Sequence, residues 1–573
     1  MRSSGTEARA AVAGLVFAGV VFVRPRVEPR VVETSRPPEM HQSLTIRDLL
    51  RQGVMRRSRQ EVVYADRLRL TYKDLDERVT RLASALAGLG MRAGHTIAVM
   101  DWDSHRYLEC FFAIPAMGAR LHMINVRLAA EQILYTINHA ADDLILVNAE
   151  FLPLLEQIWE RIERPAQLVL IDEGPAPAQT RLPVAGAYEP LLAQVDRSFA
   201  FPQLPEDSPA TTFYTTGTTG LPKGVQFTHR QIVLHTLAAA AALSRGAHGR
   251  FDEADVYMPI TPMFHVHAWG VPYVATAMAV KQVYPGRYVP ERLLELIERE
   301  RVTFSHCVPT ILQMLIATAN AKGKRLDGWK VVIGGAALPQ ALAQQALDLG
   351  IDVLSGYGMS ETCPILTLSH LQPEMLAWDA QRRLEYRCKT GRPIPMVELR
   401  VVDGDMRDVP DDGKSQGEII VRAPWATAGY VNDPDGTARL WEGGWLHTGD
   451  IAVCDANGYV KITDRLKDVI KSGGEWVSSI ELEDLILQQP GVAEAAVVAI
   501  PDERWTERPL AIVVAKPEFD LRPAAIEASL RALAERGVIS RYAVPAQILI
   551  AASLPRTSVG KLDKKALRAL YAS

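Results

Sequence analysis

The sequence predicts an α/β protein with parallel sheets, because short apolar strands alternate with helical patterns over most of the chain. TIAVM (96–100) precedes a helical pattern at 104–118, and WKVVIGGAAL (329–338) is a strand that enters a glycine turn before a helix at 340–349. LILVN, QLVLID and IDVLSGYG are further apolar strands. This alternation is typical of parallel sheets covered by helices.

The character of the sequence changes twice toward the C-terminus. Past Gly391, VELRVVDGD, GEIIVRAP and GYVKITD are short strands between turns, which favours a small antiparallel or barrel region. Near Asp464 an amphipathic helix begins, with Ser478 or Ser479 as its N-cap, and strands and a second helix follow. We therefore predict a main domain over 40–464 and a C-terminal α+β domain over 465–573.

Length and composition exclude several classes of protein. The 573 residues are too many for one core, and 48% apolar with 23% charged residues is ordinary for a globular protein. A net charge of −4 gives no overall attraction to nucleic acid. The five cysteines are scattered without a C-x-x-C pair, which argues against zinc or disulfides and fits a reducing, cytoplasmic setting.

Residues 1–39 do not match the rest of the chain, because fourteen apolar residues at 10–23 are followed by RPRVEPR. This run is short for a membrane span and within the range of a signal-peptide core. Three interpretations stay open: an over-extended start with Met40 as the true first residue, a membrane tether, and a secretory signal. A shortened protein that starts at Met40 is expected to be soluble and active.

The stretch YTTGTTGLPKG (214–224) holds four threonines, three glycines and one lysine between apolar elements. Glycine lets backbone N–H groups approach a ligand, and threonine hydroxyls with a lysine complete a phosphate nest. The stretch does not fit the G-x-x-x-x-G-K-[ST] P-loop. It predicts a phosphate cradle of another class, with a flexible linker as the alternative.

FHVHAWG (264–270) together with GGEW (473–476) most resembles the medium- and long-chain fatty acyl-CoA synthetase branch of the adenylate-forming superfamily. Six ordered motifs, which cover the chain from about residue 43 onward, resemble those of that superfamily. They are the threonine loop, GGAAL from 334, YGMSET at 357–362, GWLHTGD at 444–450, DRLKDVIKSGGEWVSS at 464–479 and PRTSVGK at 555–561. The resemblance implies two stacked α/β sheets with a small β-barrel, and a small mobile C-terminal domain. It also implies an acyl-adenylate formed from ATP, followed by transfer to coenzyme A.

The resemblance assigns the nucleotide site residue by residue. Tyr357 resembles the residue that stacks on adenine, Asp450 and Arg465 the ribose contacts, and Glu361 with Thr215 the Mg²⁺ ligands. Alone, Glu361 could be a helix-start acid and Asp450 a turn aspartate. Further contacts to phosphate, nucleotide or CoA are assigned to Thr216, Gly217, Thr218, Thr219, Gly220, Lys223, Gly334, Gly335, Gly356, Gly358 and Ser360.

The C-terminal motifs imply a lysine that acts in one half-reaction and a hinge that moves it away. Lys561 resembles the catalytic lysine, although spacing alone does not choose between it, Lys564 and Lys565. Lys467 matches the hinge, and a charged hinge stays soluble in both orientations. The resemblance also brings Lys471 near the nucleotide, and Gly473 with Gly474 into the pantetheine channel.

The segment 259–283 resembles the wall of the acyl pocket. His265 is expected at the junction of carboxylate and pocket, with Val266 and Trp269 near the nucleotide and thiol path. His265 and His267 form an H-x-H, but no acid or cysteine nearby completes a metal set. Trp476 is either a lid on a hydrophobic tunnel or ordinary packing.

Three functional hypotheses follow. The first is a medium- or long-chain fatty-acid–CoA ligase, the second a ligase for a short, thioether, branched or alicyclic acid, and the third a non-catalytic nucleotide sensor. The sensor would lack Lys561, Glu361 or Asp450, and all three are present. The sequence leaves open whether a carrier protein is the acceptor, whether the protein forms a homodimer and whether it associates weakly with membranes. Nucleic acid is not an expected partner.

Overall fold

The structure is a computed structural model that describes residues 43–164, 166–174, 178–196, 198–215, 221–246, 248–472, 475–556 and 562–571, without the side chain of Glu475. The chain separates into two units, Met1–Gln42 and Ser43–Ser573, and all described residues belong to the second. The predicted N-terminal extension therefore lies outside the described residues, and the predicted domain limits stay predictions.

The first sheet has seven strands in the order β7-β6-β5-β3-β4-β8-β9. All neighbouring strands run parallel except β8 and β9, which are antiparallel. Every residue of β3 and β5 is buried, as expected for strands covered on both faces. The strands are β3 Thr96–Met100, β4 Arg120–Met123, β5 Leu144–Asn148, β6 Gln167–Ile171, β7 Val184–Ala187, β8 Pro209–Tyr214 and β9 Gly224–Thr228.

The second sheet has nine strands in the order β16-β15-β14-β13-β12-β10-β11-β1-β2. Its centre, from β1 to β14, is parallel, and antiparallel strands lie at both edges. The strands are β1 Glu61–Tyr64, β2 Leu68–Thr71, β10 Val256–Pro259, β11 Lys281–Tyr284, β12 Phe304–Cys307, β13 Lys330–Ile333, β14 Asp352–Gly358, β15 Ile365–Leu368 and β16 Arg392–Pro393.

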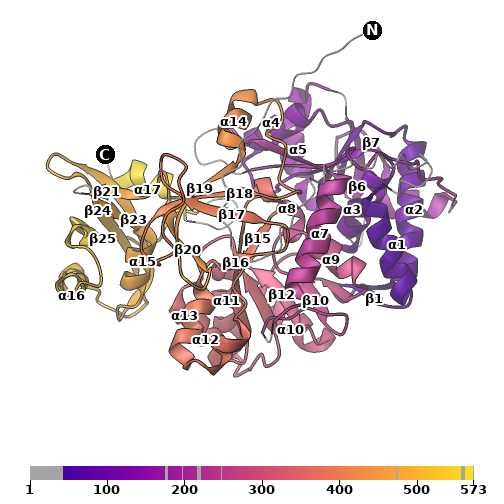
Figure 1. The fold of residues 1–573 in the computed structure, drawn as a ribbon. Coiled ribbons are helices and arrows are strands. Elements are labelled where there is room, and N and C mark those ends of the chain that lie inside the picture. The colour runs from indigo at the N-terminus through magenta and orange to yellow at the C-terminus, as the bar shows by residue number, and fades with distance from the viewer. Residues whose placement is uncertain are drawn as a thin grey trace, which may run out of the picture. The chain divides into compact units, whose positions relative to one another are not determined.

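The two sheets share one core, as the stacked arrangement predicts. A single hydrophobic cluster includes Ile97 of β3, Tyr64 of β1 and Phe112 of α3. Helices α1, α7 and α9 pack on one another beside it (Figure 1), and α10 to α13 bury a second cluster against the nine-stranded sheet. The helices are α1 Ile46–Arg57, α2 Tyr72–Gly88, α3 His105–Ala116, α4 Ala130–Ala140, α5 Leu152–Ile158, α6 Tyr188–Gln194, α7 His229–Leu243, α9 Val271–Ala277, α10 Pro290–Glu300, α11 Pro309–Ala321, α12 Gln340–Asp348 and α13 Ala380–Cys388.

The strands predicted past Gly391 form a four-stranded antiparallel sheet in the order β17-β18-β19-β20. The predicted antiparallel character is confirmed. Among the described residues β17 and β20 do not pair with each other, so these strands form an open sheet and not the closed small β-barrel that the resemblance implies. A single bridge from Val460 of β20 to Gly391 connects this sheet to the chain before β16. The elements are β17 Glu398–Val402, β18 Gly417–Arg422, α14 Pro434–Leu440, β19 Leu446–Cys454 and β20 Val460–Arg465.

The C-terminal region is a separate α+β layer with its own core. Its sheet has the order β22-β21-β24-β23, and β25 pairs with β24. Of the two predicted N-caps of α15, the structure selects Ser478, whose hydroxyl oxygen accepts a hydrogen bond from Glu481 N at 3.0 Å. The elements are β21 Ile470–Ser472, β22 Glu475–Val477, α15 Ser479–Leu487, β23 Val492–Asp502, β24 Thr506–Ala515, α16 Pro523–Glu535, β25 Gln547–Ile550 and α17 Lys564–Tyr571.

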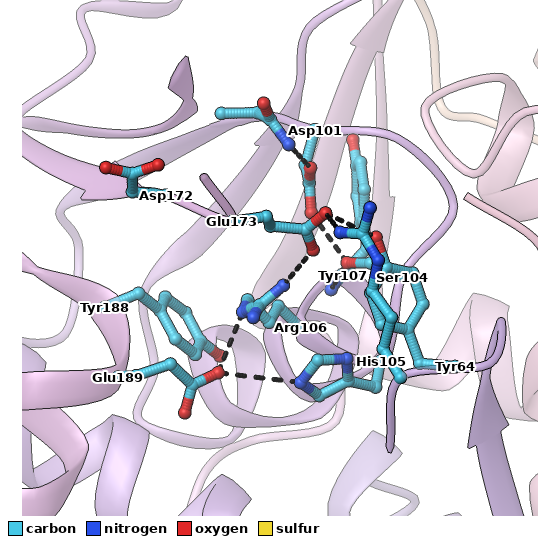
Figure 2. A network of polar contacts seen from close by, with 12 residues as sticks. Tyr64, Asp101, Ser104, His105, Arg106, Tyr107, Asp172, Glu173, Tyr188 and Glu189 are labelled. Carbon is cyan, nitrogen blue, oxygen red and sulfur yellow. Dashed lines mark hydrogen bonds and ion pairs between the residues drawn. The ribbon is translucent and has the colours of Figure 1, made fainter. Parts of the chain in front are cut away.

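A largely buried charge network ties α3 to the chain after β6 and to α6 (Figure 2). Arg106 donates to Glu173 at 2.5 Å and to Glu189 at 2.8 Å, and His105 Nε2 lies 3.6 Å from the Glu189 carboxylate. Burial opposes ionisation of Glu189, but His105, Arg78 and Arg106 together hold its pKa well below the usual range. The network thus joins segments far apart in the sequence.

None of the helices in the described part of the chain is both long and apolar enough to cross a bilayer.

Candidate active site

A cavity of about 560 Å³ lies beyond the carboxyl ends of β12, β13 and β14, where ligands of parallel sheets usually bind. It brings together most predicted site residues that the structure describes. Those that line it are Thr215, Lys223, His265, Val266, Trp269, Gly334, Gly335, Gly356, Tyr357, Gly358, Ser360, Glu361, Arg465 and Lys467.

Asp450 lies behind Tyr357 and is only 2% exposed. Its carboxylate accepts from the Tyr357 hydroxyl at 2.6 Å and pairs with Arg465 Nε at 2.9 Å. The contact across the β19–β20 ladder explains the pair, because Asp450 and Arg465 are cross-strand partners. Asp450 raises the pKa of Arg465, and burial raises that of Tyr357 well above its usual range. The three side chains thus fix one another at the cavity wall.

Glu361 is a buried carboxylate on the same wall. It follows β14 and accepts a hydrogen bond from the Tyr430 hydroxyl at 2.7 Å. Burial raises the pKa of Glu361, because desolvation penalises the anion. Lys223 Nζ lies 4.3 Å above the Tyr430 ring and 3.2 Å from the Asp433 carboxylate. Tyr430 therefore links the acid to the lysine of the threonine loop.

The two described ends of the threonine loop meet. Thr215 N donates to Lys223 O at 2.9 Å, and Lys223 N donates to Thr215 Oγ1 at 3.4 Å. This contact closes the ladder between β8 and β9 and turns both residues to the cavity. Thr216, Gly217, Thr218, Thr219 and Gly220 lie outside the described residues, so the phosphate cradle itself stays a prediction.

The wall that carries His265 contains a left-handed turn, α8, Val266–Trp269. Four consecutive residues without a glycine have φ between 47° and 58°. A side chain in this conformation costs roughly 1–2 kcal/mol per residue, so the turn stores strain at the cavity. His267 points into the core, where Nε2 lies 2.8 Å from Thr211 Oγ1, whereas His265 lines the cavity. The turn thus separates the two histidines of the H-x-H.

We expect Ala268→Gly to be less destabilising than Ala275→Gly by about 2 kcal/mol. Both alanines are fully buried and lose one methyl group, but Ala268 has φ 47° while Ala275 is in the right-handed helix α9. Glycine relieves strain at the first position and weakens the helix at the second. Urea unfolding of both variants measures the difference, and equal losses of stability would contradict the strained turn.

The cavity has an apolar limb, lined by Leu243, Val271, Phe304, Val332, Ile365 and Leu368. Phe304 is backed by Phe251, with ring centroids 4.4 Å apart. His306 also lines the cavity, and burial lowers its pKa to about 3, so its imidazole is neutral. The limb offers an uncharged, mostly hydrocarbon surface next to the polar residues of the site.

The structure does not bring every predicted residue to this cavity. Lys471 and Trp476 are cross-strand partners in the β21–β22 hairpin, and Trp476 is 42% exposed. Neither is among the residues that line the cavity, so the structure gives no support to a Trp476 lid. Gly473, Gly474 and Lys561 lie outside the described residues. Lys467 lines the cavity, and burial lowers its pKa.

Sequence reasoning missed Tyr430, and no motif marks it. Tyr430 reaches the site because it bridges Val225 of β9, and Val431 N donates to Gly224 O at 2.9 Å. These contacts join positions about two hundred residues apart. The only local signal is a lone tyrosine between a glycine and a valine, which does not indicate a site.

The sequence profile of the AMP-binding enzyme family matches residues 50–431, and that of the AMP-binding enzyme C-terminal domain matches residues 481–561. The chain belongs to the AMP-binding enzyme family. It is an AMP-forming acid–thiol ligase with acyl-CoA ligase activity, and its substrates are a carboxylic acid, ATP and coenzyme A.

Several relatives align along nearly their whole length. A long-chain-fatty-acid–CoA ligase of Thermus thermophilus is 40% identical over 93% of this chain and 96% of its own. A 3-methylmercaptopropionyl-CoA ligase of Ruegeria pomeroyi is 39% identical, with 86% and 90% covered. A medium-chain-fatty-acid–CoA ligase of Ectopseudomonas oleovorans is 34% identical, with 93% and 97% covered.

Solved structures show the same fold for this AMP-binding enzyme. An anthranilate CoA ligase in complex with anthranoyl-AMP superimposes with a TM-score of 0.81 at 24% identity, over 93% of this chain and 98% of that one. A fatty acyl CoA synthetase of Mycobacterium tuberculosis has a TM-score of 0.67 at 26% identity, with 92% and 98% covered.

Proposed function

We propose that this enzyme is a fatty-acid–CoA ligase for medium- or long-chain carboxylic acids. The observation that supports this best is the apolar limb, which is continuous with the polar part of the cavity that holds Tyr357 and Glu361. An alkyl chain gains about 0.8 kcal/mol for each methylene it buries. The names of the Thermus and Ectopseudomonas relatives agree with such a substrate.

In the first half-reaction, a carboxylate oxygen of the acid attacks the α-phosphorus of ATP, and the bond to pyrophosphate breaks. Tyr357 would stack on adenine, and Asp450 with Arg465 would hold the ribose hydroxyls. The threonine loop would hold the phosphates, and His265 would lie beside the carboxylate where the apolar limb begins. Because two anions must meet, the site has to supply positive charge, which we assign to Lys561 and to Mg²⁺.

In the second half-reaction, the coenzyme A thiolate attacks the acyl carbon, and the bond to AMP breaks. The family resemblance implies that the C-terminal domain turns about Lys467 between the two steps, which would withdraw Lys561. Tyr357, which precedes β20 in the sequence, and Lys467, which follows it, both line the cavity. This supports a site assembled from the main region and the C-terminal region.

Magnesium fits the residues present. Glu361 is a buried carboxylate on the cavity wall, and the hydroxyl of Thr215 lies on the same cavity. Desolvation disfavours the lone Glu361 anion, so a cation beside it would be stabilising. Magnesium usually takes one or two protein oxygens and completes its shell with phosphates and water. When bound, it would neutralise charge on the ATP phosphates.

We expect Glu361→Gln to slow adenylation by about 100-fold and to weaken the apparent affinity for Mg²⁺. Because burial raises the pKa of Glu361, the wild type should lose Mg²⁺ affinity as pH falls, starting above the usual glutamate range. Pyrophosphate exchange at graded Mg²⁺ and pH measures both effects. The exposed Glu374→Gln is the control, and an unchanged Mg²⁺ dependence of Glu361→Gln would refute the ligand role.

A ligase for a short or thioether acid is the second candidate, because two relatives at 39% and 36% identity are named 3-methylmercaptopropionyl-CoA ligases. A smaller acid would fill only the part of the limb nearest His265. The kcat/KM of a short-acid ligase would then not rise with the chain length of the acid, whereas the kcat/KM of a fatty-acid ligase rises with each methylene that the limb can bury.

A panel of acids separates these candidates. Straight-chain acids of increasing length, 3-(methylthio)propionate and an alicyclic acid are each supplied with ATP and coenzyme A, and AMP and acyl-CoA are measured together. The fatty-acid proposal requires kcat/KM to rise into the medium- or long-chain range. A maximum at the thioether or at short acids would establish the second candidate.

A further inference from the structure

Lys564, the first residue of α17, is a charged side chain that the reaction above does not use. It is only 12% exposed and pairs with Glu483 of α15 at 2.7 Å. Its ammonium also donates to Ser479 Oγ at 2.5 Å. Lys564 lines the same cavity, but its ammonium is held by Glu483 and Ser479, whereas Lys561 is the lysine expected to meet substrate.

The same cluster continues into the hinge segment. Ser479 N donates to Asp464 Oδ2 at 2.6 Å, and Asp464 is the residue before Arg465. One helical turn beyond Lys564, Arg568 pairs with Asp468 at 2.8 Å. Helix α17 is therefore fastened at two points to the stretch 464–468, once through α15 and once directly.

Lys564 is the cation that offsets the two buried carboxylates of this cluster. Burial raises the pKa of both Glu483 and Asp464, and the positive charge of Lys564 offsets part of this rise. Burial lowers the pKa of Lys564, but the two carboxylates outweigh it, so the lysine stays charged. Glu483 Oε1 also accepts from Val497 N at 2.7 Å, which fixes it to β23.

We propose that Lys564, Glu483 and Asp464 are positioning residues that fix the C-terminal tail (residues 562–571) relative to the hinge segment (residues 464–468). Residues of the tail, among them Leu562 and Arg568, line the same cavity as Tyr357. Asp468 lies after Lys467, so its pair with Arg568 can turn with the tail, whereas Asp464 lies before Lys467, so its contact with Ser479 holds the tail in the orientation seen here. The proposal rests on the function assigned to Lys561, which precedes this cluster by three positions.

Positioning and plain stabilisation predict different results. If the cluster only stabilises the domain, its loss lowers the melting temperature and slows both half-reactions by the same factor. If it positions the tail, adenylation falls much more than thioester formation, because only adenylation needs the tail lysine. A displacement of about 1 Å can cost about 100-fold in rate.

The test uses the double variant Lys564→Met/Glu483→Gln in the full-length protein. It removes one positive and one negative charge together, so the net charge of the cluster is unchanged, and glutamine keeps the oxygen that accepts from Val497 N. Pyrophosphate exchange should fall at least tenfold, while thioester formation from supplied acyl-adenylate stays within about twofold. Lys564→Arg should recover most of the exchange rate, since arginine can pair with the same carboxylates.

The control is Arg531→Met, which removes an exposed pair with Glu527 on α16 of the same domain. It should leave both half-reactions unchanged. Equal slowing of both half-reactions in the double variant, or no slowing of either, would overturn the proposal, as would a lack of recovery in Lys564→Arg. If the wild-type protein forms no acyl-CoA with any acid, the proposed function fails instead, and the two failures are therefore distinguishable.

Discussion

Lys561→Ala should slow acyl-adenylate formation by roughly 100- to 1,000-fold, which corresponds to about 3–4 kcal/mol of lost transition-state stabilisation. The expectation follows from the charge problem of the first half-reaction, in which a carboxylate approaches a polyanion. Thioester formation from supplied acyl-adenylate should be spared, because no new negative charge then meets the phosphate. Pyrophosphate exchange and the isolated thioester step measure the two rates.

Lys516→Ala is the matched control for this variant. Lys516 follows β24 in the same domain and is exposed, so its loss should change neither rate and should alter stability by at most about 0.5 kcal/mol. Equal slowing of both half-reactions in Lys561→Ala would contradict the assignment. Lys564 lines the cavity but is paired with Glu483, so the catalytic role stays assigned to Lys561 by the family resemblance.

Arg106→Met should destabilise the protein by about 1.5–3 kcal/mol, because Glu173 and Glu189 each lose one charged hydrogen-bond donor and keep only Arg67 and Arg78 as partner cations. Arg106 is 10% exposed and binds Glu173 and Glu189 (Figure 2). Denaturant unfolding at neutral pH measures the loss. The exposed Arg407→Met, whose pair with Asp405 has 76% and 70% exposed side chains, should cost at most about 1 kcal/mol.

The destabilisation should depend on pH in a defined direction. The pKa of Glu189 is depressed in the folded protein, so its stabilising contribution is present above the unfolded glutamate value of about 4.3. It is lost as pH falls through the folded pKa. The difference in free energy of unfolding between the wild type and Arg106→Met should therefore become smaller in acid. A difference that does not change with pH would contradict the ion-pair explanation.

Patterns local in sequence predicted most of the fold. Strand periodicity located β3, β5 and β13, and the serine before an amphipathic run located the cap of α15. The glycines of the cavity wall, such as Gly334 and Gly356, were assigned through the family resemblance and not through a strand pattern. The family resemblance, rather than spacing, supplied the roles of Tyr357, Glu361 and Asp450.

Features that depend on distant contacts were not predictable. Tyr430 reaches Glu361 through a bridge to β9 that no local pattern encodes. The left-handed turn at Val266–Trp269 contradicts the intrinsic preference of every residue in it, so only tertiary packing maintains it. From the sequence alone, Trp476 could be a lid on the cavity. In the structure it pairs with Lys471 across the hairpin of the three-residue strands β21 and β22, and its side chain is exposed.

The division of the cavity has an evolutionary consequence. The apolar limb is built from side chains within β12, β13, β15 and neighbouring helices, whereas the polar wall is built from the end of β14, the turns that follow β8, β13 and β14, and residues at and after the end of β20. On the function proposed above, substitutions in the limb would change the preferred acid while the residues assigned to ATP are inherited intact. Such divergence by parts explains how relatives at 40% and 39% identity come to be named for acids as different as a long alkyl chain and a small thioether.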